Sequence, residues 1–285
     1  MKVAFAGLGV MGFPMAGHLA KAGHEMAVYN RSPEKSARWV EAHGGRAGGT
    51  AAAAAAGAEI FILCVGNDDD VRQVVAEALP AMAHGGVIVD HTTTSAVVAR
   101  EMADLAVRAD RSFVDAPVSG GQAGAENGQL TIMCGGTEAA FAEAEPVIAA
   151  YAKATKLMGP TGAGQLAKMV NQICIAGVVQ GLAEGLHFAK RAGLDPQLVY
   201  DAISKGAAQS WQMDNRWKTM SEGKFDFGFA VDWMRKDLGL VLDEAGRNGA
   251  ALDMTRMVDG FYEEVQALGG RRWDTSSLVA RLEKP

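Results

Sequence analysis

Residues 2–12 read KVAFAGLGVMG. The first five of these residues form an apolar run that predicts a buried strand, and Gly7, Gly9 and Gly12 follow with the spacing GxGxxG. A helical segment comes next, and residues 26–29 are a second predicted strand. A strand, a GxGxxG turn, a helix and a strand within about thirty residues are typical of a dinucleotide-binding unit.

Each of the three glycines has a separate physical role in such a turn. Gly7 allows the chain to turn tightly, Gly9 lets a pyrophosphate approach the backbone, and Gly12 lets the helix pack closely on the strand. The first turn of the helix then offers N–H groups and the positive end of its dipole to the phosphates. We therefore predict a dinucleotide site at the start of the chain.

The residues that follow the second strand indicate which dinucleotide binds. An NAD site usually has a carboxylate there to hold the ribose 2′-hydroxyl. This chain has Asn30, Arg31 and Ser32 instead, and the guanidinium of Arg31 suits a phosphate. We predict NADP over NAD, with NAD left open. The alternatives are that Arg31 is an ordinary surface residue and that Ser32 caps the helix begun by Pro33.

Alternating strands and helices continue to about residue 160. The further predicted strands are 60–65, 87–90, 113–118, 130–134 and 155–158. This alternation predicts a doubly wound parallel sheet of the Rossmann type. The sequence beyond it predicts only helices. We expect an NADP-binding domain over 1–160 and an all-helical substrate and oligomerisation domain over 161–285, joined by a long interdomain helix.

That connecting helix opens with GAGQLAKMVNQ, residues 162–172, and its apolar pattern continues to about residue 192. Lys168 is the only charged residue between Gly159 and Leu182, and Asn171 shares its helix face. A solvated surface lysine is the ordinary alternative. Apolar neighbours favour a buried lysine instead, and burial lowers the lysine pKa from about 10.4, as acid–base chemistry near neutral pH requires.

Composition and charge exclude several other classes of function. The 285 residues carry a net charge of −6, and no basic run is present, which argues against a nucleic-acid partner. The cysteines, Cys64, Cys134 and Cys174, lie in apolar runs and predict buried, inert thiols in a reducing compartment. No cysteine–histidine pattern indicates a metal, and no uninterrupted apolar run predicts a membrane span. We expect a soluble cytoplasmic protein.

Two other motifs have both a functional and an ordinary interpretation. Ser119, Gly120 and Gly121 could expose adjacent backbone N–H groups to a substrate carboxylate, or could form a simple turn. Lys236 stands four residues after Asp232, so an exposed helical ion pair is the ordinary reading of that lysine.

Four motifs in order make nearly the whole chain resemble the β-hydroxyacid dehydrogenase family. They are FAGLGVMGFPM at 5–15, DAPVSGG at 115–121, GAGQLAKMVN at 162–171 and KDL at 236–238. The family includes 3-hydroxyisobutyrate dehydrogenases, tartronate semialdehyde reductases and succinic semialdehyde reductases. The resemblance implies a Rossmann domain followed by a helical domain that builds a homodimer or homotetramer.

The resemblance also implies a role for each matching residue. Lys168 would be the catalytic acid/base and Asn171 its orienting or substrate-binding partner, while Ser119, Gly120 and Gly121 would hold the substrate carboxylate. The implied cofactor residues are Gly7, Gly9, Met11, Gly12, Asn30, Arg31, Ser32, Val65, Gly66, Thr93 and Lys236. This sequence departs from the family pattern at Gly66, where many members have proline, and at Gln172, where many have a second asparagine. We expect the second departure to affect only outer polar contacts of the helix.

The predicted function is that of an NADP-dependent oxidoreductase. It would interconvert a small β-hydroxyacid, of the 3-hydroxyisobutyrate, glycerate or 4-hydroxybutyrate type, and its semialdehyde. Nicotinamide would supply hydride and Lys168 the proton. The alternatives are an imine or ketone reductase on the same fold and a non-catalytic NADP-binding member. Substrate length would be read by side chains of the helical domain, such as Trp211, Met213 and Phe229, and by a neighbouring subunit.

Overall fold

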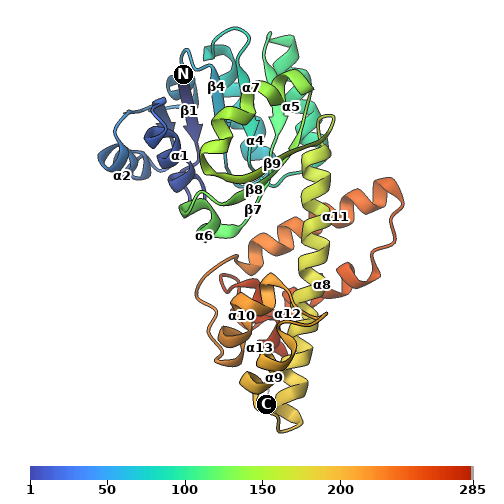
Figure 1. Cartoon of the computed structure of the whole chain (residues 1–285). Helices are drawn as coiled ribbons and strands as arrows, with labels where there is room; N and C mark the ends of the chain where they lie inside the picture. Colours follow the sequence, from blue (N-terminus) through green and yellow to red (C-terminus); the bar gives the residue numbers. More distant parts are fainter. Residues whose placement is uncertain (284–285) are drawn as a thin grey trace. The chain divides into compact units, whose positions relative to one another are not determined.

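The computed structural model describes residues 1–283, which divide into two compact units (Figure 1). The first unit comprises residues 1–168 and contains the sheet. The second begins at Met169 and consists of helices. The predicted class, a Rossmann-type sheet followed by a helical domain, is confirmed. Helix α8, Ala163–Arg191, runs through the division between the units.

The strands of the first unit form one sheet. Among the described residues the strands are β1 Lys2–Ala6, β2 Glu25–Tyr29, β3 Arg46–Ala47, β4 Ile60–Leu63, β5 Val87–Asp90, β6 Ser112–Asp115, β7 Val118–Ser119, β8 Leu130–Gly135 and β9 Ala152–Gly159. Their order is β3-β2-β1-β4-β5-β6-β8-β7, with β9 on the other edge of β8. The strands from β3 to β6 are all parallel, in the order of the dinucleotide-binding fold.

The last part of the sheet differs from the uniformly parallel pattern that we expected. β8 runs antiparallel to β6 and β7, and β9 runs parallel to β8. The predicted strand over 113–118 is also interrupted: β6 ends at Asp115, and β7 resumes at Val118 after Ala116-Pro117. A proline has no N–H to donate to a ladder, which accounts for the break.

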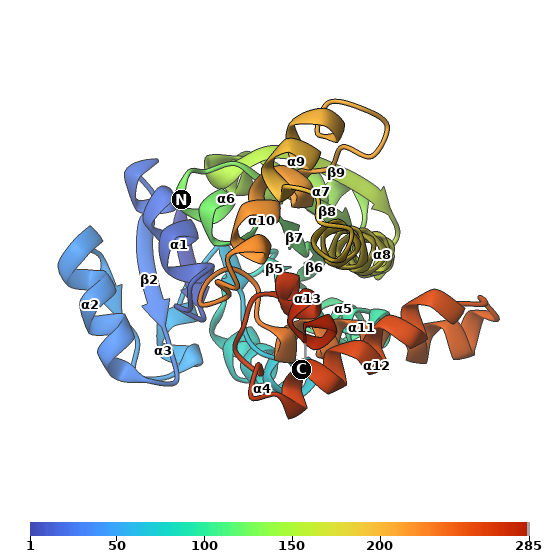
Figure 2. The same ribbon diagram turned by 90° about the horizontal axis from the view of Figure 1, so that it is seen from below.

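Alternate strand residues face two separate apolar cores. Val3 and Phe5 of β1 pack in one core, with Ile60 and Ile62 of β4, whereas Ala4 and the other intervening residues pack in the second. The helices of the first unit are α1 Gly12–Lys21, α2 Pro33–His43, α3 Ala51–Ala55, α4 Asp68–Ala78, α5 Ala96–Arg108, α6 Gly121–Glu126 and α7 Glu138–Ile148. Figure 2 shows α1 and α6 on one side of the sheet and α4 and α5 on the other. Both faces of the sheet are therefore buried, as a parallel sheet requires.

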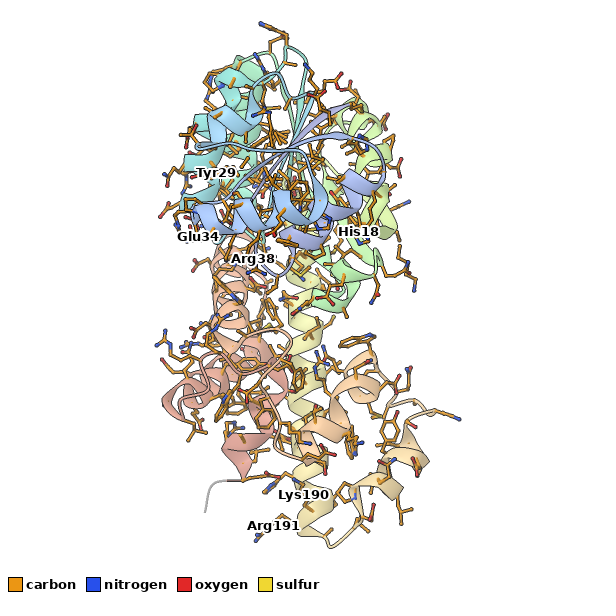
Figure 3. The ribbon with its side chains drawn as sticks, turned by 90° about the vertical axis from the view of Figure 1, so that its left-hand side faces the viewer. His18, Tyr29, Glu34, Arg38, Lys190 and Arg191 are labelled. Atoms are coloured by element: carbon orange, nitrogen blue, oxygen red, sulfur yellow. The ribbon has the colours of Figure 1, made fainter. Side chains whose placement is uncertain are left out.

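The second unit packs its helices around the apolar face of α8. The helices after α8 are α9 Pro196–Ile203, α10 Trp211–Ser221, α11 Val231–Asn248, α12 Asp253–Ala267 and α13 Leu278–Leu282. Ala176, Val179, Ala183 and Leu186 recur at helical spacing on α8 and are buried in this core. Lys190 and Arg191 lie at the C-terminal end of α8, where cations suit the helix dipole (Figure 3).

The opposite face of α8 is exposed and largely apolar. Val170 is 60% exposed and Phe188 71% exposed, and Cys174 and Val178 lie between them on the same face. Within residues 1–283, α8 alone is long and apolar enough to cross a membrane, judged by length and composition. Part of its most apolar window, 44%, is buried inside the protein, and core helices of water-soluble proteins pass the same test.

The expectation that all three cysteines are buried is wrong, and the ordinary alternative for Lys236 does not hold. Cys134 is buried as predicted, but Cys64 is half-buried and Cys174 is exposed, because position 174 falls on the outer face of α8. The helical ion pair between Asp232 and Lys236 does not form. Asp232 instead accepts a hydrogen bond from Gln266 at 2.6 Å and pairs with Arg271 at 3.4 Å, since α11 packs against α12 there.

Candidate functional site

The glycine-rich turn after β1 is shaped to leave one position open. Gly7 has a φ of +95°, and a side chain there would overlap the carbonyl oxygen of Cys64. A side chain at Gly12 would overlap the carbonyl oxygen of Gly7, so α1 can begin this close to the strand only with glycine. At Gly9, in contrast, an added Cβ meets nothing within 4 Å. The open side of the turn at Gly9 fits a pyrophosphate on the first turn of α1, which begins after Met11.

The predicted nucleotide-selecting residues lie at the end of β2. Asn30 braces the glycine turn, because its Oδ1 accepts a hydrogen bond from Leu8 N at 2.9 Å. Arg31 is 85% exposed and pairs with Asp70 at 3.3 Å. Ser32 precedes α2 as its N-cap residue, but its hydroxyl makes no capping hydrogen bond. Arg31 and Ser32 are therefore both exposed at this edge of the sheet.

Asp70 connects Arg31 to the loop that follows β4. Its Oδ2 accepts a hydrogen bond from Gly66 N at 3.2 Å, while its Oδ1 faces Arg31. A proline at position 66 would have no N–H to donate. The departure from the family pattern at Gly66 therefore allows a contact that holds Asp70 beside Arg31.

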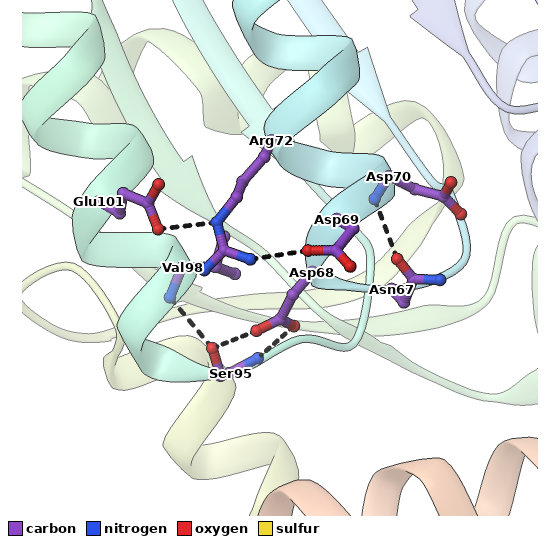
Figure 4. A network of polar contacts seen from close by, with 8 residues as sticks. All are labelled: Asn67, Asp68, Asp69, Asp70, Arg72, Ser95, Val98 and Glu101. Carbon is purple, nitrogen blue, oxygen red and sulfur yellow. Dashed lines mark hydrogen bonds and ion pairs between the residues drawn. The ribbon is translucent and has the colours of Figure 1, made fainter.

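The loops that follow β4 and β5 are tied together by side chains (Figure 4). Asp68 accepts hydrogen bonds from Ser95 N at 3.0 Å and from Ser95 Oγ at 2.5 Å. Val65 N donates to Thr92 Oγ1 at 3.0 Å. These bonds hold Val65 and the neighbouring Thr93 at the carboxyl edge of the parallel strands, where ligands bind in open α/β sheets.

A buried carboxylate fixes the mouth of α8. Asp115, at the end of β6, accepts hydrogen bonds from Gly162 N at 2.7 Å and from Gln165 N at 2.9 Å. Burial raises the pKa of the Asp115 carboxyl to about 6, against the opposing effect of these N–H groups. A side chain at Gly164 would lie 2.7 Å from Asp115 O, so this glycine lets the helix start against the strand.

Gln165 connects the same turn of α8 to the loop that follows β5. Its Oε1 accepts a hydrogen bond from Thr94 N at 3.0 Å, and its Nε2 donates to Thr92 O at 2.7 Å. The side chain is fully buried. The two bonds bracket Thr93, a predicted cofactor residue.

A buried histidine anchors the start of the Thr92–Thr94 loop. His91 contacts Ala116 O through Nδ1 at 2.6 Å and Tyr151 Oη through Nε2 at 2.8 Å. A carbonyl oxygen only accepts, so Nδ1 carries the proton and Nε2 accepts from the tyrosine hydroxyl. Burial lowers the pKa of His91 to about 4, although the bond to Ala116 opposes the shift. His91 is therefore a neutral anchor of the loop and not an acid–base candidate near neutral pH.

Lys168 and Asn171 lie on one face of α8, as their spacing predicts. Lys168 is 8% exposed, so the buried-lysine interpretation holds over the solvated one. Ser119 ends β7, and the next two glycines, Gly120 and Gly121, have φ values of +132° and +62°. Both φ values lie in the region that favours glycine, so the turn after β7 needs glycine at these two positions.

A second polar cluster lies within the helical unit. Gln172 Nε2 donates to Asp237 Oδ2 at 2.7 Å, and Gln172 Oε1 accepts from Asn171 Nδ2 at 2.8 Å. Lys236 pairs with Asp237 at 3.2 Å. Gln172 is 2% exposed, so its contacts are internal, not outer as we expected. This unit thus joins Asn171 and Lys236 through a buried amide and a buried carboxylate.

The sequence pattern missed several residues of this arrangement. Asp115, Gln165 and His91 are buried and hydrogen bonded, yet the sequence predicted no role for any of them, although the first two lie within the motifs at 115–121 and 162–171. The signal for Gln165 was available: it is a polar residue three positions before Lys168 on the same apolar helix. Met213 was also misjudged. It is 1% exposed in the core of the helical unit and cannot contact a substrate, whereas Trp211 is 54% exposed and Phe229 38%.

The fold and this edge of the sheet define a dinucleotide-binding protein. The sequence model described as the NAD binding domain of 6-phosphogluconate dehydrogenase matches residues 2–159. The one described as NAD-binding of NADP-dependent 3-hydroxyisobutyrate dehydrogenase matches residues 162–282. The chain belongs to the β-hydroxyacid dehydrogenase family, as its motifs predict.

Individual relatives extend over the whole chain. An uncharacterized oxidoreductase of Shewanella frigidimarina is 64% identical, with 99% of this chain and 98% of that protein covered. The 2-hydroxy-3-oxopropionate reductase of Escherichia coli is 34% identical, with 99% and 97% covered. The structure of Mycobacterium tuberculosis 3-hydroxyisobutyrate dehydrogenase with L-serine has a TM-score of 0.91 at 31% identity, and 99% of each chain is covered.

Residues 1–283 contain no group of three or more histidine, cysteine, aspartate or glutamate side chains that could hold a metal ion.

Proposed function

We propose that the protein is an NADP-preferring oxidoreductase that interconverts a short β-hydroxyacid and its semialdehyde. The observation that carries this proposal is the burial of Lys168 on α8, one helical turn after a residue that is hydrogen bonded to the Thr92–Thr94 loop. A lysine withdrawn from water is suited to proton exchange near neutral pH. The open glycine turn at Gly9 supports the accompanying dinucleotide site.

In this proposal the protein supplies position and a proton. A bound nicotinamide cofactor supplies the hydride chemistry. The Lys168 ammonium hydrogen bonds to the aldehyde oxygen and donates a proton as that oxygen becomes an alkoxide. In the oxidative direction the neutral amine accepts the proton of the alcohol. Asn171, on the same helix face, orients the reacting oxygen.

The proposed substrate carries a carboxylate. Adjacent N–H groups at Gly120 and Gly121, with the Ser119 hydroxyl, suit a carboxylate at a fixed distance from the reacting carbon. Two relatives named above support this class, because their names specify 2-hydroxy-3-oxopropionate and 3-hydroxyisobutyrate. We therefore expect a substrate of three to five carbons, such as tartronate, methylmalonate or succinic semialdehyde.

The proposed preference for NADP rests on the end of β2. No carboxylate stands at residues 30–32, and Arg31 is exposed there. Asp70 forms an ion pair with the Arg31 guanidinium, and its negative charge repels a bound phosphate. We therefore expect measurable activity with NAD as well. Lys236 stays a proposed cofactor residue of the helical unit.

We also propose a cytoplasmic homodimer or homotetramer built through the helical unit. The exposed apolar face of α8 supports this assembly, because Val170, Val178 and Phe188 would leave water when a second copy covers them. Glu184 is the only charged residue on that stretch of the exposed face. Light scattering on Phe188→Glu tests the proposal: dissociation is expected, and a monomeric parent protein would contradict it.

A substrate panel tests the proposed activity. The parent protein is assayed at the nicotinamide absorbance with each semialdehyde, with aldehydes of equal length that lack the carboxylate, and with cyclic imines and simple ketones. We expect kcat/KM for at least one semialdehyde to exceed that of its carboxylate-free match by about 10²-fold, the scale of two charge-assisted hydrogen bonds. Activity confined to imines or ketones, or none on any carbonyl, would refute it.

A further inference from the structure

We infer that Gln165 is a positioning residue that fixes the direction of Lys168 relative to the Thr92–Thr94 loop. This inference rests on the proposed function, since it concerns how that lysine is held. Gln165 is hydrogen bonded to Thr92 and Thr94, the residues on either side of Thr93. Lys168 lies one helical turn after Gln165 on α8. A single side chain thus joins the proposed proton donor to the loop predicted to line the nicotinamide.

The contacts of Gln165 use both halves of its amide. Its Oε1 accepts from Thr94 N at 3.0 Å and its Nε2 donates to Thr92 O at 2.7 Å, so the loop backbone is held on both sides of Thr93. Only an amide offers a donor and an acceptor in that arrangement at every pH. The side chain has no exposed surface, so water cannot replace either bond without entering the core.

The backbone of Gln165 is fixed as firmly as its side chain. Its N–H donates to Asp115 Oδ2 at 2.9 Å, and Gly162 N donates to the other carboxyl oxygen of Asp115 at 2.7 Å. The first turn of α8 therefore cannot rotate without breaking bonds to β6. Lys168 follows three residues later in the same continuous helix, so its Cα–Cβ direction is set by this turn.

The loop on the other side is held independently of Gln165. Val65 N donates to Thr92 Oγ1, and Asp68 accepts from Ser95. Removing the Gln165 amide should therefore not unfold the loop. It should release the link between loop and helix, which is the behaviour of a positioning residue and not of a general support.

The test compares Gln165→Met with Gln180→Met. Both glutamines are buried on α8, but Gln180 donates to Glu184 on its own helix and does not touch the Thr92–Thr94 loop. In the cofactor-free protein, hydrogen exchange should become about tenfold faster at Thr94 N in Gln165→Met only, which corresponds to loss of one buried hydrogen bond. The dissociation constant of NADPH, read from its fluorescence, should change less than about threefold in both variants.

The substitution should lower kcat without changing KM. We expect kcat of Gln165→Met to fall by about 10²-fold, as for a misplacement near 1 Å, with KM for the semialdehyde nearly unchanged. The isotope effect with nicotinamide-deuterated NADPH should rise toward its intrinsic value, because hydride transfer becomes limiting. A kcat within a few-fold of the parent, or equal losses in the Gln180 variant, would overturn the inference.

Two further measurements keep the inference falsifiable. If Gln165→Met does not fold, hydrogen exchange in the parent protein decides: a Thr94 amide that exchanges as fast as an exposed loop amide would overturn the inference. A parent protein without semialdehyde activity would refute the proposed function, while the exchange comparison would still test the link that Gln165 makes.

Discussion

The charge balance at the end of β2 depends on two residues, Arg31 and Asp70. Arg31 is exposed and its partner carboxylate lies 3.3 Å away. Exposed ion pairs of this kind contribute little to stability, so the guanidinium can turn to a bound phosphate. Asp70 nevertheless stays nearby through its bond to Gly66 N, and its charge opposes that phosphate.

Substitutions at these residues should change the cofactor preference in opposite directions. Arg31→Ala should lower the ratio of kcat/KM for NADPH to that for NADH by about tenfold or more, the scale of one charged hydrogen bond. Asp70→Asn should raise the same ratio by roughly threefold, because a like charge is removed near the phosphate. Steady-state kinetics with both cofactors measure the ratio.

Arg72→Ala is the matched control for this experiment. Arg72 of α4 is paired with Asp69 and with Glu101 of α5 (Figure 4), away from Arg31, so its loss should leave the ratio unchanged. A parent protein that prefers NADH, or an Arg31→Ala variant with an unaltered ratio, would show that the preference is set elsewhere.

Two glycines of the turn between β1 and α1 should have different roles, one in stability and the other in cofactor binding. A methyl group at Gly12 overlaps the carbonyl of Gly7, whereas one at Gly9 meets nothing within 4 Å. Gly12→Ala should therefore lower the free energy of unfolding by about 1–3 kcal/mol or more, the usual cost of overpacking. Gly9→Ala should leave it nearly unchanged yet weaken NADPH binding about tenfold or more, since it occupies the side left for phosphate.

Denaturant unfolding and NADPH titration measure the two effects separately. Tight cofactor binding by Gly9→Ala would show that the phosphates approach another part of the turn. A normal unfolding free energy for Gly12→Ala would show that α1 can shift to accommodate the methyl group.

The loop after β5 should lose stability in acid because of His91. Its pKa is about 4 in the folded protein and near 6.5 when unfolded, so the unfolded chain binds the proton first as the pH falls. The stability contributed by the neutral ring is present above pH 6.5 and is lost as the pH falls toward 4. The full shift corresponds to about 3 kcal/mol.

His91→Gln isolates this contribution. The difference in unfolding free energy between parent and variant should shrink by up to that amount between pH 6.5 and 4, and the opposite contribution of Asp115 cancels in the comparison. A difference that stays constant over this range would mean that the ring is protonated in the folded state.

Local patterns predicted the elements and the turn at β1, but not how the elements are linked. The glycine spacing, the buried strands and the burial of Lys168 follow from residues close together in sequence. The bond from Thr94 to Gln165 joins residues 71 positions apart, and that from Val65 to Thr92 joins residues 27 apart. The sequence around each of these residues does not indicate its partner, because only the fold brings the two together. The antiparallel direction of β8 was not predicted either, because an apolar run indicates a buried strand but not whether that strand runs parallel or antiparallel to its neighbours.

Across the whole molecule, one helix belongs to both units and presents the residue on which the proposed chemistry depends. Lys168 is the last residue of the first unit and is buried, and Asn171 begins the polar cluster of the second. Hydrogen bonds to Asp115 fix the start of α8, and the apolar core of the helical unit packs against its later turns. The account therefore depends on that lysine as the exchanger of a proton.

The most direct measurement is the turnover of Lys168→Ala with NADPH and the best semialdehyde of the panel. The account predicts a loss of kcat of about 10²–10⁴-fold, the usual contribution of general acid–base catalysis, with the dissociation constant of NADPH within a few-fold of the parent. Lys153→Ala, on the strand β9, is the control and should keep full activity. Turnover of Lys168→Ala within tenfold of the parent would contradict the account.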